Sequence, residues 1–563
     1  MISQQVLDTS WEQVKQFWLH LTLNQPRMLK KGENDTGEIA WFDFDEKQIS
    51  VDEENLEKKL GADKLRPVLN HEVGHYKLCP FGLRGFVRLA AHAYKSTKNL
   101  ELAKLAENLF ADLLVNTHLY NKGEVGIKSV YDKFTERNNS VGWSFYISTM
   151  EYMIGRPGSI LKNPPDEKVR KDAKQISDIM SQVLYKSERW PETIEEFAKY
   201  VKKYMHDEKQ NQQKGPGQTI PVPGAGQGQS QGAGGNGQDD KQTSQNGENN
   251  GLSPKPLIDQ HDVENFIPFD KDKAPKEQVD RYIDEQIRGI STEVGYDVFK
   301  VIVAGLGLGS RKQARIWFYK DLAASYSLDL PLTNAAIRTS KPQVPKKWRT
   351  SDPIERLNVE YSLSNFGVLV PNVTTYQFIS EKLSFAGQSD ETPDLLIALD
   401  SSGSMPNPDT EISFPVISAM LAAQAALDRG KKVAVVNFSS AYKYSNFTNN
   451  SNELDETIAH YFNGGTEIPG NIIKKLIAKH NHPVHVLIIS DTEISNISSE
   501  IENLEYALKK GGAGGTIFID CAPSAKTKRL TEIGFDVQYT RSFDDLADLT
   551  LKKAKGLYAT VGG

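Results

Sequence analysis

This sequence has few cysteines, no long apolar run and little excess of charge of either sign. Only two cysteines, Cys79 and Cys521, occur in 563 residues, which excludes a disulfide framework and favours a reducing compartment. No stretch approaches the roughly eighteen uninterrupted apolar residues of a membrane span, and no basic leader precedes an apolar core at the N-terminus. A net charge of −6 gives no broad basic surface for nucleic acid. We therefore expect a cytoplasmic protein that binds neither membrane nor nucleic acid.

Length and composition predict several domains separated by a linker. At about 100–200 residues per domain, the chain can hold about two to four domains. Residues 207–256 are rich in Gly, Gln and Asn and contain no aromatic residue, so they bury too little apolar surface to fold. We expect a disordered linker there, with a reach of roughly 40 Å. It separates an N-terminal domain over 1–206 from a largely helical intermediate region over 257–390 and a C-terminal domain over 391–563.

The N-terminal domain has a mostly helical pattern with a short strand region. Apolar residues alternate between Glu38 and Val51, which predicts one or two strands. Further along, apolar residues recur at helical spacing from Leu65 to Tyr76, and Pro80 ends the run. We expect a compact helical domain around the helix that these residues form.

That helix contains the sequence His71-Glu72-Val73-Gly74-His75. Two histidines four residues apart project from one stripe of a helix and can share a zinc ion, while the glutamate can take a proton from zinc-bound water. Surface helices also carry such residues without binding metal. The order of strand, HExxH helix and further helix resembles zincin-type metallopeptidases, and this resemblance implies a zinc site with Glu72 as general base.

A third zinc ligand is expected from the segment between residues 100 and 120. Asn108, Asp112 and Asn116 form a polar stripe at spacings of four on an otherwise apolar helix. At 100° per residue, Glu107 lies about 140° and His118 about 120° from Asp112, so both are expected to face elsewhere. Asp112 is therefore the predicted ligand, with Asn108 and Glu107 as the alternatives.

The resemblance to zincins is incomplete at this helix. In zincins with a Glu-x-x-x-Asp helix, the glutamate binds the metal and the aspartate supports a histidine. Asn108 occupies the glutamate's place in this sequence. The resemblance thus leaves open whether Asp112 binds zinc or orients a histidine, and whether the site is catalytic or structural.

Strand-like and helix-like segments alternate regularly after Thr392. This order predicts a doubly wound, mainly parallel α/β sheet of the Rossmann-like class. In such sheets, ligands bind at the carboxyl ends of the strands. The fold class is therefore multidomain, with a helical zincin-like domain, a disordered linker and a C-terminal α/β domain.

Oxygen-bearing side chains cluster at three of these predicted strand or loop ends. They are Asp400, Ser402 and Ser404 in a DxSxS motif, Thr466 in a glycine-containing loop, and Asp491 after another strand. Carboxylates and hydroxyls suit Mg²⁺ and not zinc. All five positions match the metal-ion-dependent adhesion site of von Willebrand factor A domains, which this segment resembles.

The resemblance implies a protein-binding device, because such a site leaves one metal position for a carboxylate from another molecule. The arrangement of a zincin-like N-terminal domain, a linker and a von Willebrand A domain at the C-terminal end resembles that of bacterial and archaeal proteins that work with MoxR-type AAA+ ATPases. Three functions follow as alternatives. The first is a zinc metallopeptidase whose C-terminal domain recruits the ATPase or a protein substrate. The second is a non-catalytic adaptor or co-chaperone with a structural zinc site, and the third is a metal-chelatase-like subunit.

Overall fold

The computed structural model describes the chain in two compact units, Met1–Ala314 and Arg315–Gly563. The described residues are 2–19, 21–29, 38–43, 46–135, 140–205, 266–269, 273–328, 344–350, 352, 357, 362, 369–372, 375–379, 392–491, 494–519, 525–540 and 546–558. The linker predicted over 207–256 and Cys521 lie outside them. The intermediate region predicted over 257–390 is divided between the two units at Ala314.

The first unit begins with a helix and a small sheet. Helix α1 (Gln4–Trp18) is followed by strands β1 (Arg27–Leu29), β2 (Ala40–Asp43) and β3 (Gln48–Asp52). The sheet order is β1-β3-β2, with β1 parallel and β2 antiparallel to β3. The prediction of strands between residues 38 and 51 is confirmed.

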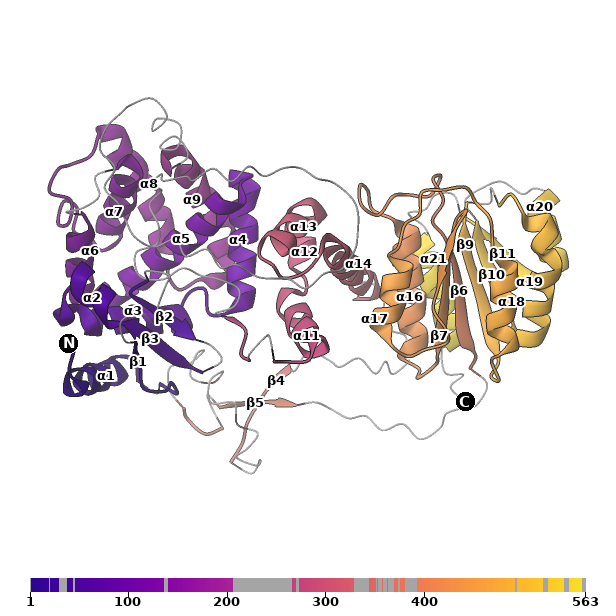
Figure 1. Ribbon diagram of the computed structural model, residues 1–563, viewed down its shortest axis with the longest axis horizontal. Coiled ribbons are helices and arrows are strands. Elements are labelled where there is room, and N and C mark those ends of the chain that lie inside the picture. Colours follow the sequence, from indigo (N-terminus) through magenta and orange to yellow (C-terminus); the bar gives the residue numbers. More distant parts are fainter. Residues whose placement is uncertain are drawn as a thin grey trace. The chain divides into compact units, whose positions relative to one another are not determined.

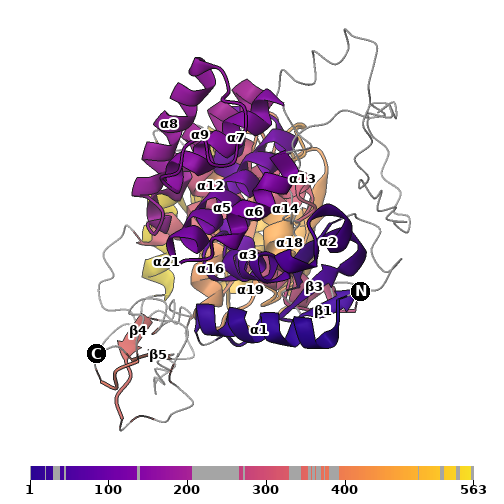
Figure 2. The same ribbon diagram turned by 90° about the vertical axis from the view of Figure 1, so that its left-hand side faces the viewer.

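Helices make up most of the rest of this unit. In chain order they are α2 (Glu53–Lys59), η1 (Ala62–Lys64), α3 (Leu65–Lys77), α4 (Leu83–Thr97), α5 (Leu100–Asn121), α6 (Gly126–Thr135), α7 (Val141–Met153), α8 (Glu167–Gln182), η2 (Ser187–Arg189) and α9 (Trp190–Met205). The long helix α5 runs through their middle and packs against α3, α4, α6, α7 and α9 (Figures 1 and 2). Its N-cap is Asn99, whose side chain accepts a hydrogen bond from the Leu102 amide.

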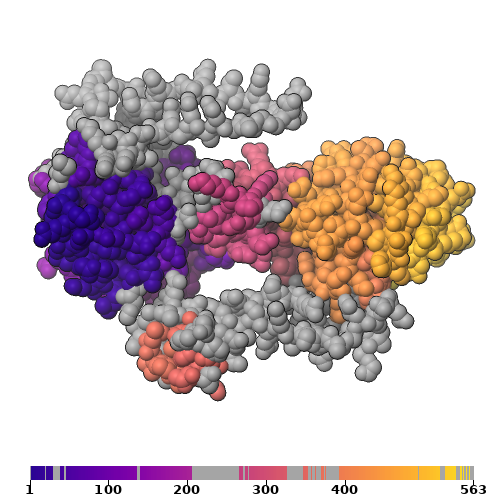
Figure 3. Space-filling model, turned by 60° about the horizontal axis from the view of Figure 1, so that its bottom comes forward, coloured from indigo at the N-terminus to yellow at the C-terminus, as the bar shows by residue number. Residues whose placement is uncertain are grey.

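Three helices from beyond the linker segment belong to the same unit. They are α11 (Lys276–Ile287), α12 (Ile290–Val294) and α13 (Tyr296–Gly305), and each packs against α4. Their residues form the deep pink part of the surface in Figure 3. The Phe86 and Phe266 rings stack at 5.1 Å, and Arg88 forms a two-pronged ion pair with Glu293. The first unit is thus assembled from two stretches that are distant in sequence.

The second unit is built on a six-stranded sheet with the order β11-β10-β9-β6-β7-β8. Its strands are β6 (Asp394–Asp400), β7 (Val433–Phe438), β8 (Tyr442–Tyr444), β9 (Val484–Ser490), β10 (Gly512–Ile519) and β11 (Phe535–Tyr539). All neighbours are parallel except β8, which is antiparallel to β7. The chain adds strands on one side of β6 and then on the other, which is a doubly wound order. The predicted α/β sheet is confirmed.

Helices cover both faces of this sheet, and the central strands are accordingly buried throughout and mostly apolar. Every residue of β6, β7 and β9 is buried, as expected for parallel strands covered on both sides. Leu396 and Ala398 share a core with α18 (Gly470–Ala478) and α19 (Ile497–Gly511). Leu395 lies on the other face with Ala422 of α16 (Phe414–Leu427) and Ala554 of α21 (Leu546–Tyr558).

The remaining elements of this unit are shorter. They are β4 (Val344–Lys347) and β5 (Tyr376–Ile379), which pair antiparallel, and the helices α17 (Ser451–Ile458) and α20 (Ala525–Glu532). Helix α14 (Arg311–Leu328) carries the chain from the first unit into the second. Over the described part of the chain, every helix is too short or too polar to cross a membrane.

Candidate metal centres

Helix α3, which carries the HExxH sequence, crosses helix α5 at close range. Gly74 lies where an added Cβ atom would come within 2.3 Å of Val115 Cγ1 on α5. A larger residue there would push the two helices apart. Val115 lies three residues after Asp112 and thus on a neighbouring part of the same helical face. The glycine therefore allows His71 and His75 to approach Asp112.

Three side-chain atoms of these residues converge. Nε2 of His71 lies 3.0 Å from Nε2 of His75, and Oδ1 of Asp112 lies 3.3 Å and 3.2 Å from these two nitrogens, respectively. A tetrahedral zinc ion with bonds of about 2.0–2.1 Å holds its ligand atoms about 3.3 Å apart. Within the described ranges, this is the one group of three His, Cys, Asp or Glu side chains whose ligand atoms lie close enough together to hold an ion. The triangle fits zinc.

In each histidine, the ring nitrogen that faces away from the triangle contacts a hydrogen-bond acceptor. Nδ1 of His71 lies 2.8 Å from Oδ1 of Asn116, and Nδ1 of His75 lies 2.8 Å from the main-chain oxygen of Cys79. Carbonyl oxygens only accept hydrogen bonds, so both Nδ1 atoms carry the proton and donate. A neutral ring that carries its proton on Nδ1 directs the lone pair of Nε2 into the triangle, as metal-binding histidines require.

A chain of hydrogen bonds, here called the tyrosine relay, joins the histidine side of the triangle to the carboxylate side. Nδ2 of Asn116 donates to the Tyr131 hydroxyl at 2.7 Å. The hydroxyls of Tyr131 and Tyr146 lie 3.3 Å apart, and Tyr146 donates to Oδ2 of Asp112 at 3.5 Å. The oxygen of Asn116 accepts from His71 and its amide nitrogen donates to Tyr131. Each group in the relay therefore donates to the next one, from His71 through Asn116, Tyr131 and Tyr146 to Asp112. The relay thus ties the orientation of His71 to that of Asp112.

The charge state of the triangle suits a cation. His71, His75 and Asp112 are 0%, 4% and 4% exposed. Burial by itself raises the pKa of the Asp112 carboxyl, but the adjacent His71 and His75 side chains outweigh it and hold this pKa well below its usual range. An ionised carboxylate in such a setting needs a compensating positive charge.

Two further buried carboxyls lie close to the triangle. Burial, and then the charges of Asp112 and Glu72, raise the pKa of Tyr131, which places Glu72 near the tyrosine relay. Burial also raises the pKa of Glu107 well above its usual range, with His75 opposing the rise and Asp112 adding to it. Glu107 was expected to face elsewhere on helical geometry, yet it interacts electrostatically with His75 and Asp112. It is not among the three convergent ligands.

The other candidates on α5 occupy different positions. Asn108 is buried, and the convergent group of His and carboxylate ligands forms without it. Nδ1 of His118 contacts the Tyr185 hydroxyl at 3.0 Å, and its ring stacks on Trp18 at 5.3 Å. His118 therefore belongs to a separate aromatic cluster.

The two carboxylates predicted to bind magnesium lie at the carboxyl ends of neighbouring strands. Asp400 ends β6, and Asp491 directly follows β9, the strand that pairs with β6. Oδ1 of Asp400 accepts a hydrogen bond from the Ser402 amide at 2.9 Å, and Oδ2 accepts one from the Ser490 hydroxyl at 2.6 Å. The hydroxyl oxygens of Ser402 and Ser404 lie 3.1 Å apart.

The loop that bears Thr466 is held against this motif by main-chain contacts. The Gly403 amide donates to the Gly464 oxygen at 2.8 Å. A Cβ atom on Gly464 would lie 2.4 Å from Ser439 Oγ, so only glycine permits this approach. The Ser495 amide donates to the Thr466 oxygen at 2.8 Å, which joins the loop to the segment after β9. The structure thus brings together the loops that carry all five predicted residues.

Electrostatics at this second centre also suit a cation. Burial raises the pKa of Asp400 to about 6, although hydrogen bonds from Ser490 and Ser402 lower it, and the charge of Asp491 adds to the rise. A nearby cation would relieve both the burial and the repulsion between the two carboxylates. Carboxylate and hydroxyl oxygens are the ligands that Mg²⁺ prefers, so these residues fit that ion.

Four contributing side chains were not predicted from the sequence. Tyr131 and Tyr146 complete the first centre from α6 and α7, while Ser490 and Tyr461 support the second. Ser490 directly precedes Asp491, so its position at the strand end was a usable signal. The three tyrosines carry no such signal, because long-range packing alone brings them to the sites.

Comparison with known proteins adds little to this geometry. No protein-family model and no curated protein matches the sequence. Among solved structures, the vWF domain of the type V pili tip protein Mfa5 from Porphyromonas gingivalis is similar, with 11% identity and a TM-score of 0.24. The match covers 31% of this chain and 97% of that chain. The two centres therefore rest on the contacts of their own residues.

Proposed function

We propose that the first unit binds one zinc ion through His71, His75 and Asp112 and acts as a metallopeptidase. The observation that carries this proposal is the triangle of ligand atoms, with edges of 3.0, 3.2 and 3.3 Å. Three protein ligands with a glutamate between the histidines are typical of a hydrolytic zinc site, in which one position stays open.

The peptidase chemistry assigns a distinct task to each group. Zinc, when bound, supplies the Lewis acidity that makes water a good nucleophile near neutral pH. The Glu72 carboxylate takes one proton from the attacking water and gives it to the amide nitrogen as the peptide bond breaks, so the products are an acid and an amine. Asn116 and the Cys79 carbonyl hold the two histidine rings in place throughout.

A single substitution tests Glu72. Glu72→Gln keeps the size of the side chain and the three zinc ligands, so it should retain zinc while losing roughly 10²- to 10⁴-fold in rate on an unfolded protein substrate. Glu107→Gln is the matched control, because Glu107 is also buried near the triangle. Loss of rate in the Glu107 variant with full rate in the Glu72 variant would transfer the role of base to Glu107.

One observation favours a second function, that of a non-catalytic adaptor. The three ligands are 0–4% exposed and Glu72 is 0% exposed, and closed zinc sites are generally structural. In this case the wild-type protein would show no turnover on unfolded proteins, with or without an ATPase partner. Removal of zinc would then lower stability without affecting any hydrolysis.

We further propose that the second unit is a von Willebrand A domain that binds a protein partner through Mg²⁺. Support comes from the five residues Asp400, Ser402, Ser404, Thr466 and Asp491, which match its adhesion-site motif. One metal position is left for a carboxylate from the partner. The partner is proposed to be a MoxR-type AAA+ ATPase or a protein substrate, whose Asp or Glu completes the metal shell.

A further inference from the structure

Helix α14 contributes one face to the loop that follows the DxSxS motif. Arg315 and Tyr319 are four residues apart and thus share a helical face. The Arg315 guanidinium lies 3.1 Å from the Asp409 carboxylate, and Tyr319 is fully buried. Both residues reach the segment Met405–Ser413, which joins the metal motif to α16.

The Tyr319 hydroxyl fixes the far end of this segment. It donates to the Glu411 oxygen at 3.0 Å, with the Pro408 oxygen at 3.4 Å, and it accepts a hydrogen bond from the Ser413 amide at 2.9 Å. Ser413 is the N-cap residue of α16, and its own side chain makes no capping hydrogen bond. A hydroxyl from α14 therefore sets where the segment ends and where α16 begins.

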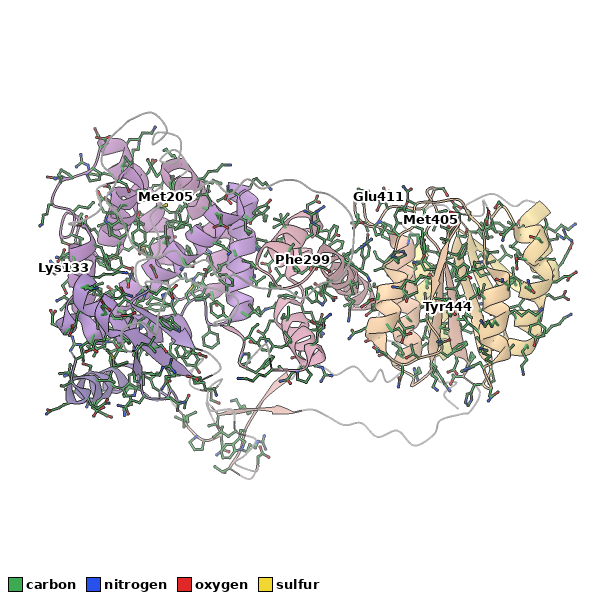
Figure 4. All side chains as sticks on the ribbon, viewed as in Figure 1. Lys133, Met205, Phe299, Met405, Glu411 and Tyr444 are labelled. Carbon is green, nitrogen blue, oxygen red and sulfur yellow. The ribbon has the colours of Figure 1, made fainter. Side chains whose placement is uncertain are left out.

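A second tyrosine fixes the near end. The Tyr461 hydroxyl contacts the main-chain oxygens of Ser402 and Met405, at 3.2 Å and 3.1 Å. Tyr461 lies just before the loop that carries Thr466. Met405 and Glu411, labelled in Figure 4, both lie at the end of the second unit where α16 begins. The segment is thus held between one hydroxyl from the domain's own loop and one from α14.

We propose that Tyr319 is a positioning residue for the magnesium site, and that α14 controls this site by holding or releasing the segment Met405–Ser413. This inference rests on the proposed Mg²⁺ binding by the second unit. Preorganised ligands bind an ion more tightly, because less order must be imposed on binding. With Tyr319 in place, Ser402 and Ser404 are held in the positions in which they bind the ion. Without it, the same ligands must be ordered by the ion itself.

The test is calorimetric titration of Mg²⁺ into the full chain after zinc loading. Tyr319→Phe keeps the ring but removes the hydroxyl, and we expect Mg²⁺ affinity to fall about 3- to 10-fold, as for one or two lost hydrogen bonds. Arg315→Gln should weaken affinity in the same direction. The control is Tyr506→Phe, which removes a hydroxyl from a half-exposed side chain on α19 of the same unit, and it should bind as wild type.

Hydrogen exchange gives a readout that does not depend on metal. In EDTA-treated protein, amides between Met405 and Ser413 should exchange faster in Tyr319→Phe than in wild type, while the strands of the sheet stay protected. Unchanged exchange and unchanged Mg²⁺ affinity in this variant would overturn the inference alone. Failure of wild type to bind Mg²⁺, or equal binding by Asp400→Ala, would overturn the proposed function of the site and the inference with it.

Discussion

Nδ1 of His71 lies 2.8 Å from Oδ1 of Asn116, two helical turns along α5 from the position of Asn108. This hydrogen bond decides which ring nitrogen of His71 carries the proton, and so which one faces the metal. It also fixes the Asn116 amide toward Tyr131. The proposed zinc site therefore depends on a residue outside the three convergent ligands.

Asn116→Ala should weaken zinc binding about 10- to 100-fold, the usual loss when a metal-bound histidine loses its outer hydrogen-bond partner. Asn108→Ala is the matched control, since Asn108 is also a buried amide side chain on α5. Competition with a chromophoric chelator measures both affinities. A larger loss in the Asn108 variant than in the Asn116 variant would contradict the assignment.

The tyrosine relay makes a separate prediction. Tyr146→Phe removes the hydroxyl that contacts Oδ2 of Asp112 at 3.5 Å, and Tyr131→Phe removes the acceptor of the Asn116 amide. Each variant leaves one buried donor without its acceptor, but Tyr131→Phe breaks the 2.7 Å hydrogen bond to the residue that orients His71, whereas Tyr146→Phe breaks contacts of 3.3 and 3.5 Å. Tyr131→Phe should therefore lose more zinc affinity than Tyr146→Phe. The same competition assay ranks them. The reverse order, or no change in either, would show that the relay does not support the site.

The first centre was predicted in its ligands but not in its supports. The spacing of His71 and His75 and the stripe through Asp112 follow from helical periodicity, which is a local property. Tyr131 and Tyr146 come from other helices, and their arrival depends on tertiary packing. Gly74 illustrates the difference, because the HExxH pattern leaves that position open and only the crossing of α3 and α5 shows why it is glycine.

The second unit was more fully predicted, because alternating strands and helices have a strong sequence signal. The two edge strands β8 and β11 and the helices α17 and α20 were not anticipated. Pro275 to Ala314 was expected in a separate intermediate region, whereas this stretch packs in the first unit through contacts such as Arg88 with Glu293. Such long-range pairing leaves no periodic pattern in the sequence.

His118 predicts a pH dependence of stability. Burial, with a smaller effect of Lys122, lowers the pKa of His118 to about 4, against about 6.5 in an unfolded chain. Between pH 6.5 and 4 the unfolded chain binds the extra proton, so the stability present above pH 6.5 is lost as the pH falls toward 4. His118→Gln cannot titrate, so its Tm should fall less steeply over this range than that of wild type. Parallel Tm curves would contradict the prediction.

Binding of the protein partner should require both Mg²⁺ and the Asp400 carboxylate. Asp400→Ala removes a charged ligand from the motif, and a loss of about 2–4 kcal/mol would weaken partner affinity roughly 30- to 1000-fold. A pull-down with a candidate MoxR-type ATPase, run with Mg²⁺, with EDTA and with the variant, measures this. Equal capture in all three conditions would show that docking occurs elsewhere.

The central claim is that His71, His75 and Asp112 form a zinc site. Metal analysis of the full chain after zinc loading and removal of excess ion tests it most directly, with His71→Ala, His75→Ala and Asp112→Ala in parallel. We expect about one zinc per wild-type chain and a large loss in each variant, since each removes one of three convergent ligand atoms. Zinc at 100 times its Kd should also stabilise the wild type by about 2.7 kcal/mol. Wild-type protein without zinc, or three variants that retain it, would contradict the claim.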